Sequence, residues 1–260
     1  MDIATLIGLV LAWGAFLGSI LIEGGDLSAL VNPSAALLVF GGTLGASMIC
    51  FPLSTVTSLP SIVKNAFLSK KEDVGHLIKT LVGYAEKARR EGLLALEDEV
   101  QKMDDPFLKK GIQLAIDGTD PELVREIMQT DIQFLGSRHH EGANLFGTMG
   151  GFAPTLGVIG TVSGLVHMLA NLSDPGSMGP SIAAAFIATL YGVCSANLLF
   201  LPLGNKLKAI SHEEVLVREV IMEGILAIQA GDNPRIVEEK LKAFLSPKIR
   251  RAIEAEAAAV

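Results

Sequence analysis

Four long apolar stretches without a charged side chain dominate the pattern of hydrophobic and polar positions along the chain. They cover residues 3–22, 35–63, 142–173 and 175–205, and none contains Asp, Glu, Lys or Arg. A helix of about 20 residues crosses a hydrocarbon core of about 30 Å, so each stretch is long enough to span a membrane. The sequence therefore predicts an all-α membrane protein with four transmembrane helices.

The basic residues predict the orientation of these helices. All 21 Lys and Arg residues lie within residues 64–138 and 206–251. The two remaining connections are acidic, with Glu23 and Asp26 in one and Asp174 in the other. Because basic segments beside membrane helices stay in the cytoplasm, we expect both termini, the middle region and the tail to be cytoplasmic. No basic residue precedes the first stretch, so we expect a retained helix rather than a cleaved signal peptide.

This pattern divides the chain into four parts. Transmembrane helices 1 and 2 lie in residues 1–56, and transmembrane helices 3 and 4 lie in residues 142–205. Between them, residues 57–141 are expected to form a cytoplasmic helical domain. Residues 206–260 are expected to form the cytoplasmic C-terminal helices.

Helical periodicity continues in both cytoplasmic parts. Apolar residues three or four positions apart over residues 74–103 predict one amphipathic helix or a helix pair, with Gly92 as a break or a close contact. No alternating pattern predicts a strand. Further helices are expected over residues 106–116, 121–135, 213–230 and 235–245.

The apolar stretches lack the side chains that usually carry ions across a bilayer. Ionisable residues inside a membrane mark ion and proton paths. Besides two cysteines, these stretches offer only His167 and Tyr191 as titratable groups. A lone histidine is more typical of an interface or a hydrogen-bonded position than of a proton relay. Either the protein moves no ion, or a partner chain supplies the acid.

Hydroxyl oxygens and helix-breaking residues are present instead. The hydroxyls of Thr161 and Thr189 could coordinate a partly dehydrated cation, or they could bond the backbone one turn earlier. Pro154 and Pro202 each remove a backbone hydrogen bond, so they predict kinks that are either static or hinges. A Gly-x3-Gly pattern at residues 160–164 predicts close packing against another helix without identifying that helix.

Five blocks of sequence point to a family. They cover residues 1–5, 89–97, 153–162, 188–202 and 223–241. On these blocks, and over nearly its whole length, the chain resembles the A subunit of the bacterial flagellar stator. That is the MotA/PomA family, within the wider MotA/TolQ/ExbB group.

The resemblance implies a function that fits the missing acid. In this family a single-span B subunit carries the ion-binding aspartate, and five A subunits surround two B helices in the bacterial inner membrane. Proton or sodium flow past that aspartate rotates the A ring, whose cytoplasmic parts turn the switch protein of the flagellar rotor. The resemblance thus implies a non-enzymatic channel subunit with no cofactor other than the transported H⁺ or Na⁺.

The resemblance also implies roles for residues in the third and fourth spans. Thr161 and Thr189 match threonines on the ion path. Pro154 and Pro202 match prolines linked to conformational coupling. Ala188 stands where some sodium-driven relatives carry a second threonine, so the coupling ion stays open between proton and sodium.

A charged cluster in the middle region is implied to contact the rotor. The family uses a basic and an acidic residue eight positions apart, and Arg90 and Glu97, seven apart, would also share one face of a continuous helix. Such exposed charges add little stability, but they steer docking. The alternative is a solvated helix face with no partner. The charges expected at the contact are Arg89, Arg90, Glu91, Glu97, Asp98 and Glu99.

Other classes of function fit the sequence less well. The net charge of −7 argues against nucleic-acid binding. The sequence shows no nucleophile–base pair, metal-ligand spacing or phosphate-binding loop, which argues against an enzyme. Two alternatives stay open: an ExbB/TolQ-like energiser subunit, whose relatives typically have three spans, and a membrane scaffold that transports nothing.

Overall fold

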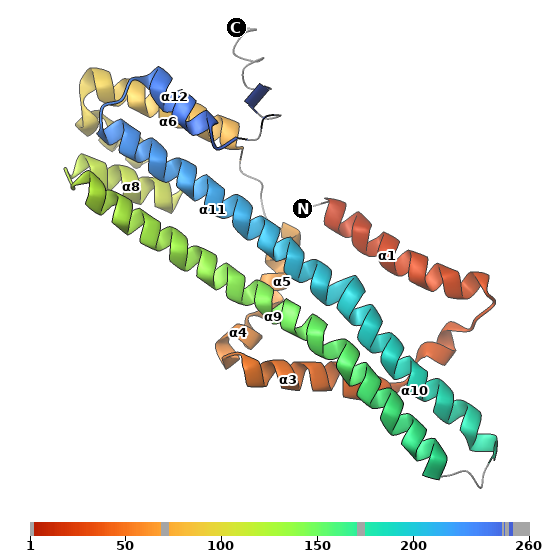
Figure 1. Cartoon of the computed structure of the whole chain (residues 1–260). Helices are drawn as coiled ribbons and strands as arrows, with labels where there is room; N and C mark the ends of the chain where they lie inside the picture. The colour runs from red at the N-terminus through yellow and green to blue at the C-terminus, as the bar shows by residue number, and fades with distance from the viewer. Residues whose placement is uncertain (1–2, 69–72, 171–174, 246, 248–249, 252–260) are drawn as a thin grey trace. The chain divides into compact units, whose positions relative to one another are not determined.

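The computed structural model describes residues 3–68, 73–170, 175–245, 247 and 250–251, and within them every regular element is helical (Figure 1). This confirms the predicted all-α fold. Four helical segments are long and apolar enough to cross a membrane, which confirms the predicted spans. They are Ile3–Ile22, Pro33–Cys50, Pro121–Ala170 and Met178–Gln229. The expected acidic connection at Asp174 lies outside the described residues.

Contacts divide the chain into two compact units, which we describe separately. The membrane unit comprises Met1–Ser69 and His139–Ile210, and the polar unit comprises Lys70–Arg138 and Ser211–Val260. Both long helices, α9 (Pro121–Ala170) and α11 (Leu201–Gln229), contribute residues to each unit.

The first half of the membrane unit is a series of helices separated by capping residues and prolines. Asn32 begins the second span, because its side chain accepts a hydrogen bond from the Ala35 amide and a proline follows it. Phe51 ends that span in an extended conformation, as expected for a residue before proline. The elements are α1 (Ile3–Ile22), η1 (Leu27–Leu30), α2 (Pro33–Ala36), the π-helical η2 (Leu37–Gly41), α3 (Gly42–Cys50), α4 (Leu53–Thr57) and α5 (Leu59–Leu68).

Helix α9 packs closely against α10 (Pro175–Ser195) because glycines remove the side chains between them. A Cβ atom added at Gly164 would lie 2.8 Å from the Cβ of Ala185, and one at Gly157 would lie 2.9 Å from the carbonyl oxygen of Ala188. A Cβ atom at Gly192 would clash with the carbonyl of Ala153. The predicted Gly-x3-Gly contact at residues 160–164 therefore faces the fourth span.

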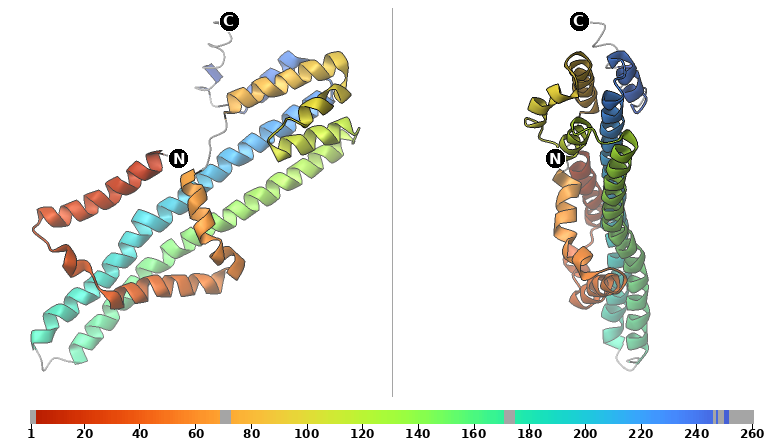
Figure 2. Two further views of the ribbon diagram at one scale, coloured as in Figure 1. Left: turned by 180° about the vertical axis from the view of Figure 1, so that it is seen from behind. Right: turned by 90° about the vertical axis from the view of Figure 1, so that its left-hand side faces the viewer.

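The polar unit is a helical cluster around one apolar core. Helices α6 (Val74–Glu91) and α12 (Pro234–Lys242) lie side by side in both views (Figure 2). Aspartates cap the N-termini of α6 and α8 (Pro106–Ile116), at Asp73 and Asp105. The largest side chains that are fully buried in this core are Ile78, Leu81, Leu96, Ile112, Val124, Met128, Val220, Ile221, Ile225 and Leu241.

The structure merges helices that the sequence pattern separates. The helices expected over 121–135 and 142–173 are one helix, α9. Gly136 follows the first predicted segment and Gly142 begins the second, yet neither ends the helix. A glycine inside a helix costs only about 1 kcal/mol, which tertiary packing offsets. Here Val215 contacts the first glycine position and Ile62 the second.

We expect Gly192→Ala to destabilise the membrane unit, because its new methyl group would overlap the Ala153 carbonyl. Overpacking of this kind costs about 1–3 kcal/mol. The thermal unfolding midpoint of the detergent-solubilised protein should fall. The control is Gly151→Ala, because apart from the local helix backbone and the adjacent residues no described atom lies within 4 Å of a Cβ at that position. Equal midpoints for the two variants would contradict the close α9–α10 contact.

Candidate functional site: span hydroxyls and a charged turn

The structure brings the two threonines predicted on the ion path together. The hydroxyls of Thr161 on α9 and Thr189 on α10 lie within hydrogen-bonding distance of each other, and either one can donate. The Thr161 hydroxyl is 3.1 Å from the carbonyl oxygens of both Gly157 and Ala185. The Thr189 hydroxyl is 3.3 Å from that same Gly157 oxygen. Two hydroxyls and two carbonyls therefore form one cluster of oxygen atoms between the spans.

This cluster can serve either of the roles that the sequence leaves open. The bond from Thr161 to Gly157 is the backbone bond one turn earlier that a threonine commonly makes in a helix. Carbonyl and hydroxyl oxygens are also the groups that replace the water around a cation in channels. Both threonine side chains are only partly buried, so these oxygen atoms are not sealed inside the unit.

The two predicted coupling prolines occupy different settings. Pro154 lies inside α9, partly buried, where α10 approaches through Gly192. Pro202 lies on an exposed face of α11, directly after the π-helical segment η4 (Ala196–Phe200). A proline ring collides with the carbonyl four residues earlier in a regular helix, and a π-helical turn relieves that collision.

Tyr191 has a role that the sequence did not indicate. Its hydroxyl donates to the carbonyl oxygen of Leu30 and accepts a bond of 3.1 Å from the amide of Asn32. Its ring packs against Phe40, with 5.9 Å between centroids. The fourth span thus binds the connection between the first two spans. No spacing rule could have found this, because the partners are backbone atoms about 160 residues away.

The charges predicted to contact a rotor flank a turn at Gly92. Helix α6 carries Arg89 and Arg90 in its last turn, and α7 (Glu97–Val100) begins with three acids, after the 3₁₀ turn η3 (Leu93–Leu96). Basic residues at a helix C-terminus and acids at an N-terminus both interact favourably with the helix dipole. The expectation that Arg90 and Glu97 share one helical face is wrong, because Gly92 ends α6 with φ +88° and ψ 162°.

Glu99 differs from the other predicted contact charges. Arg89, Arg90, Glu91, Glu97 and Asp98 are exposed, whereas Glu99 is half-buried and its carboxylate is 2.9 Å from the ammonium of Lys87. The hydrogen bond from Lys87 holds the pKa of Glu99 below its ordinary value, and the same bond raises the pKa of Lys87. Sequence reasoning missed Lys87, because no helical spacing relates residues on opposite sides of a glycine turn.

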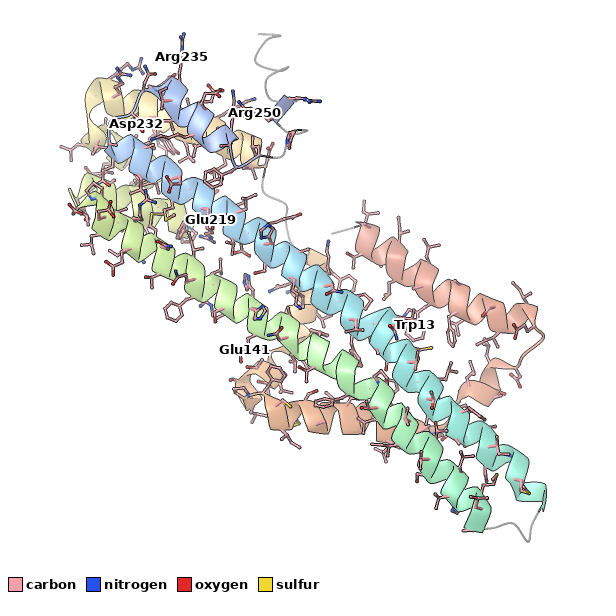
Figure 3. The ribbon with its side chains drawn as sticks, in the orientation of Figure 1. Trp13, Glu141, Glu219, Asp232, Arg235 and Arg250 are labelled. Carbon is pink, nitrogen blue, oxygen red and sulfur yellow. The ribbon has the colours of Figure 1, made fainter. Side chains whose placement is uncertain are left out.

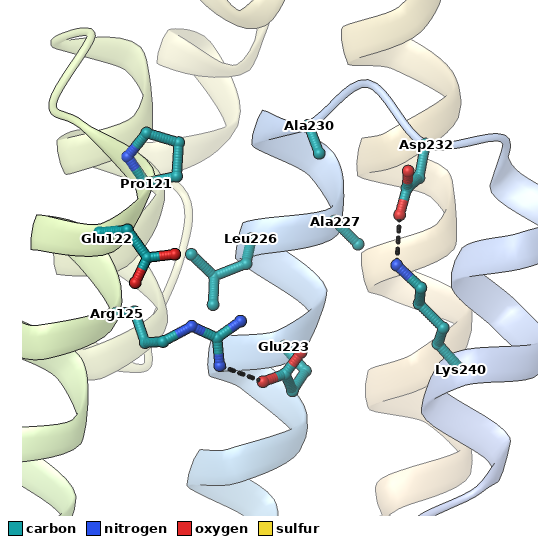
Figure 4. A pocket seen from close by; sticks show the side chains of 9 residues that line it. All are labelled: Pro121, Glu122, Arg125, Glu223, Leu226, Ala227, Ala230, Asp232 and Lys240. Atoms are coloured by element: carbon teal, nitrogen blue, oxygen red, sulfur yellow. Dashed lines mark hydrogen bonds and ion pairs between the residues drawn. The ribbon is translucent and has the colours of Figure 1, made fainter.

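The described residues hold further polar contacts away from the threonine cluster and the Gly92 turn. A depression in the polar unit holds two ion pairs, Arg125 with Glu223 at 2.7 Å and Asp232 with Lys240 at 2.6 Å (Figure 4). Glu141 on α9, labelled in Figure 3, accepts a 2.8 Å hydrogen bond from Thr55. In the described part of the chain, no group of three or more His, Cys, Asp or Glu residues could hold a metal ion.

These features define a four-span helical membrane subunit with a helical polar unit. The sequence matches the MotA/TolQ/ExbB proton channel family over residues 99–220 and the motility protein A N-terminal family over residues 6–92. Together with the relatives described next, these matches show that the chain belongs to the motility protein A family, which is an ion-channel family and not a family of enzymes.

Relatives align with almost the whole chain. Motility protein A of Bacillus subtilis (strain 168) is 40% identical over 251 residues, which are 96% of this chain and 93% of that protein. The solved structure of C. jejuni MotAB superimposes with a TM-score of 0.90 at 34% identity, covering 95% of this chain and 97% of that one. The structure of the flagellar MotAB stator complex from Bacillus subtilis superimposes with a TM-score of 0.88 at 40% identity, and again covers 95% of this chain and 97% of that one.

We expect Gly92→Ala to destabilise the polar unit, because the backbone at Gly92 adopts a conformation that is essentially restricted to glycine. Such strain costs about 1–3 kcal/mol. Gly83→Ala is the matched control, since Gly83 is exposed inside α6 and a helical alanine gains up to about 1 kcal/mol over glycine. Thermal unfolding midpoints should therefore move in opposite directions. A neutral Gly92→Ala would contradict the strained turn.

Proposed function

We propose that this chain is the A-type subunit of a flagellar stator, which forms an ion path with a single-span B-type subunit and converts ion flow into torque. One observation carries the proposal: the relatives that align with almost the whole chain are motility proteins, and the solved neighbours are MotAB complexes. In such a complex this chain has no carboxylate of its own to offer within the spans, because the apolar stretches over residues 3–22, 35–63, 142–173 and 175–205 contain no Asp, Glu, Lys or Arg. An ion that crosses a bilayer needs an ionisable or strongly polar site. In this proposal the ion-binding acid therefore comes from another chain, and this chain lines the ion path.

The partner is a B-type subunit whose single span carries the ion-binding aspartate. Support comes from the solved relatives, which are complexes named MotAB. The oxygen cluster at Thr161 and Thr189 faces the ion path in this proposal. Pro154 and Pro202 transmit the ion-driven change along α9 and α11.

Several copies of the chain surround the B-type helices, five of them as the family resemblance implies. Helix α1 supports such an assembly, because none of its residues is buried within the chain. Its apolar side chains are therefore available for lipid or for a neighbouring copy. The complex lies in the bacterial inner membrane with both termini in the cytoplasm, where the exposed charges at the Gly92 turn meet the rotor switch protein.

The subunit has no cofactor other than the transported ion, no enzymatic activity and no nucleic-acid partner in this proposal. An ExbB/TolQ-like energiser is the alternative, since such proteins share the channel family. The match of residues 6–92 to motility protein A favours the stator, because this segment includes the first two spans and the basic side of the Gly92 turn.

A complementation experiment tests the function. A flagellated strain that lacks its own A-type subunit should swim again when it receives this chain together with its B-type partner. Speed that follows sodium and survives a protonophore identifies sodium coupling, and speed that ignores sodium and collapses with the protonophore identifies proton coupling. If both proteins reach the membrane and swimming does not return in either condition, the stator function is wrong.

We expect Thr189→Ala to change the ion dependence of swimming more than it changes assembly. The variant removes one oxygen from the cluster, and a single hydrogen-bonding group contributes about 1 kcal/mol, or about a fivefold shift in the ion concentration at half-maximal speed. Ser19→Ala is the control, because its hydroxyl bonds only the local backbone of α1 at Phe16. An unchanged ion titration for Thr189→Ala would remove this residue from the ion path.

A further inference from the structure

We infer that Glu99 acts inside the chain as a positioning residue, which fastens the turn after Gly92 to helix α6, and that it is not itself a contact to the rotor. The inference rests on the proposed function, since it decides which charges at this turn remain for a partner. It separates Glu99 from Glu97 and Asp98, its neighbours in α7, which are exposed.

The contact geometry distinguishes Glu99 from its neighbours. Its carboxylate is 2.9 Å from the Lys87 ammonium and 3.8 Å from that of Lys102. The side chains of Lys87 and Glu99 are only 28% and 29% exposed, whereas that of Arg90 is 74% exposed. A pair that is partly withdrawn from water is screened less by salt than a fully exposed pair. The Glu99 carboxylate is therefore already paired within the chain, whereas the Arg90 guanidinium is accessible to a partner.

The pair joins the two sides of the turn. Lys87 lies one helical turn before Arg90 on α6, and Glu99 lies within the same short helix as Glu97. Beneath them, Leu96 and Val100 are buried in the core of the polar unit. Apolar burial fixes the inner face of the turn, and the Lys87–Glu99 bond fixes its outer edge. The spacing between the exposed basic and acidic groups thus depends on both.

Charge balance supports the same assignment. The bond from Lys87 lowers the pKa of Glu99 from its ordinary value of 4.5, so the contribution of the paired carboxylate is lost only when the pH falls through that lowered pKa. Burial and the nearby Glu99 charge together raise the pKa of Tyr84. Because Lys87 and Glu99 neutralise each other, the field that a partner meets comes mainly from the exposed charges.

The test compares single and paired charge changes in the assembled complex. The variants are Glu99→Lys, Lys87→Glu, the double charge swap that combines these two substitutions, and the neutral pair Lys87→Met with Glu99→Gln. The matched control is Glu97→Lys, which reverses an exposed charge in the same helix. Swimming speed measures torque. Amide hydrogen exchange over residues 93–103 in the detergent-solubilised complex measures how firmly the turn is held.

We expect Glu99→Lys to slow swimming and to raise exchange over residues 93–103 by about tenfold, as local opening becomes easier. The double charge swap should recover most of the swimming speed and most of the protection from hydrogen exchange. Lys102 does not prevent this, since its side chain is 70% exposed and can turn away from the new lysine. The neutral pair should also keep most of the speed. Glu97→Lys should slow swimming and leave exchange unchanged.

Two results would overturn the inference. Unchanged exchange in Glu99→Lys would show that the pair does not hold the turn. If the double charge swap restores slow amide hydrogen exchange but does not restore swimming speed, the Glu99 charge itself meets the partner. If exchange follows the expected pattern but the unmodified chain supports no swimming, the positioning role stands and the stator function fails.

Discussion

The rest of the membrane unit depends on how closely the backbones of α9 and α10 approach each other. Glycines at 157, 160, 164 and 192 present no side chain of their own, so backbone carbonyl groups and alanine methyl groups form the contact. In a bilayer, where apolar surface alone gives helices little reason to associate, such contacts provide much of the attraction. They also place the hydroxyls of Thr161 and Thr189 against each other. A larger residue at any of these positions would separate the oxygen atoms.

The polar unit is organised by a different rule. Its core is an ordinary apolar cluster, and the charged turn at Gly92 lies at the edge of that cluster. Gly92 ends α6, and Leu96 returns the chain to the core. The charges on the two sides of this turn are divided into a paired set, Lys87 and Glu99, and an exposed set. Two glutamates in one short helix therefore differ: Glu97 is exposed, whereas Glu99 is half-buried and paired with Lys87. Sequence spacing alone carries no information about that division.

Much of the fold could be predicted, because membrane spans and helix starts have strong local signals. Charge-free runs located the four spans, and residues 106–116 form the helix expected from their caps. The helix expected over residues 121–135 was expected to lead into the third span, but the sequence did not show that the two form the single helix α9. The side chains that pack at Gly136 and Gly142 have no signal in the local sequence. For the candidate site, the sequence pointed to the hydroxyls of Thr161 and Thr189, which the structure brings together, and to charges that it places around a turn rather than on one helical face. It did not point to Lys87 or to the backbone partners of Tyr191. Those contacts are set by tertiary structure, which has no periodicity in sequence.

The bonds made by Tyr191 have a consequence for how the membrane unit meets its surroundings. The phenol satisfies a carbonyl at Leu30 and an amide at Asn32, two polar groups that would otherwise need water. A short connection whose backbone is satisfied by the protein can rest against lipid headgroups without a hydration shell of its own. When lipid or an adjoining chain removes water from this connection, the Leu30 carbonyl and the Asn32 amide therefore cost little desolvation free energy.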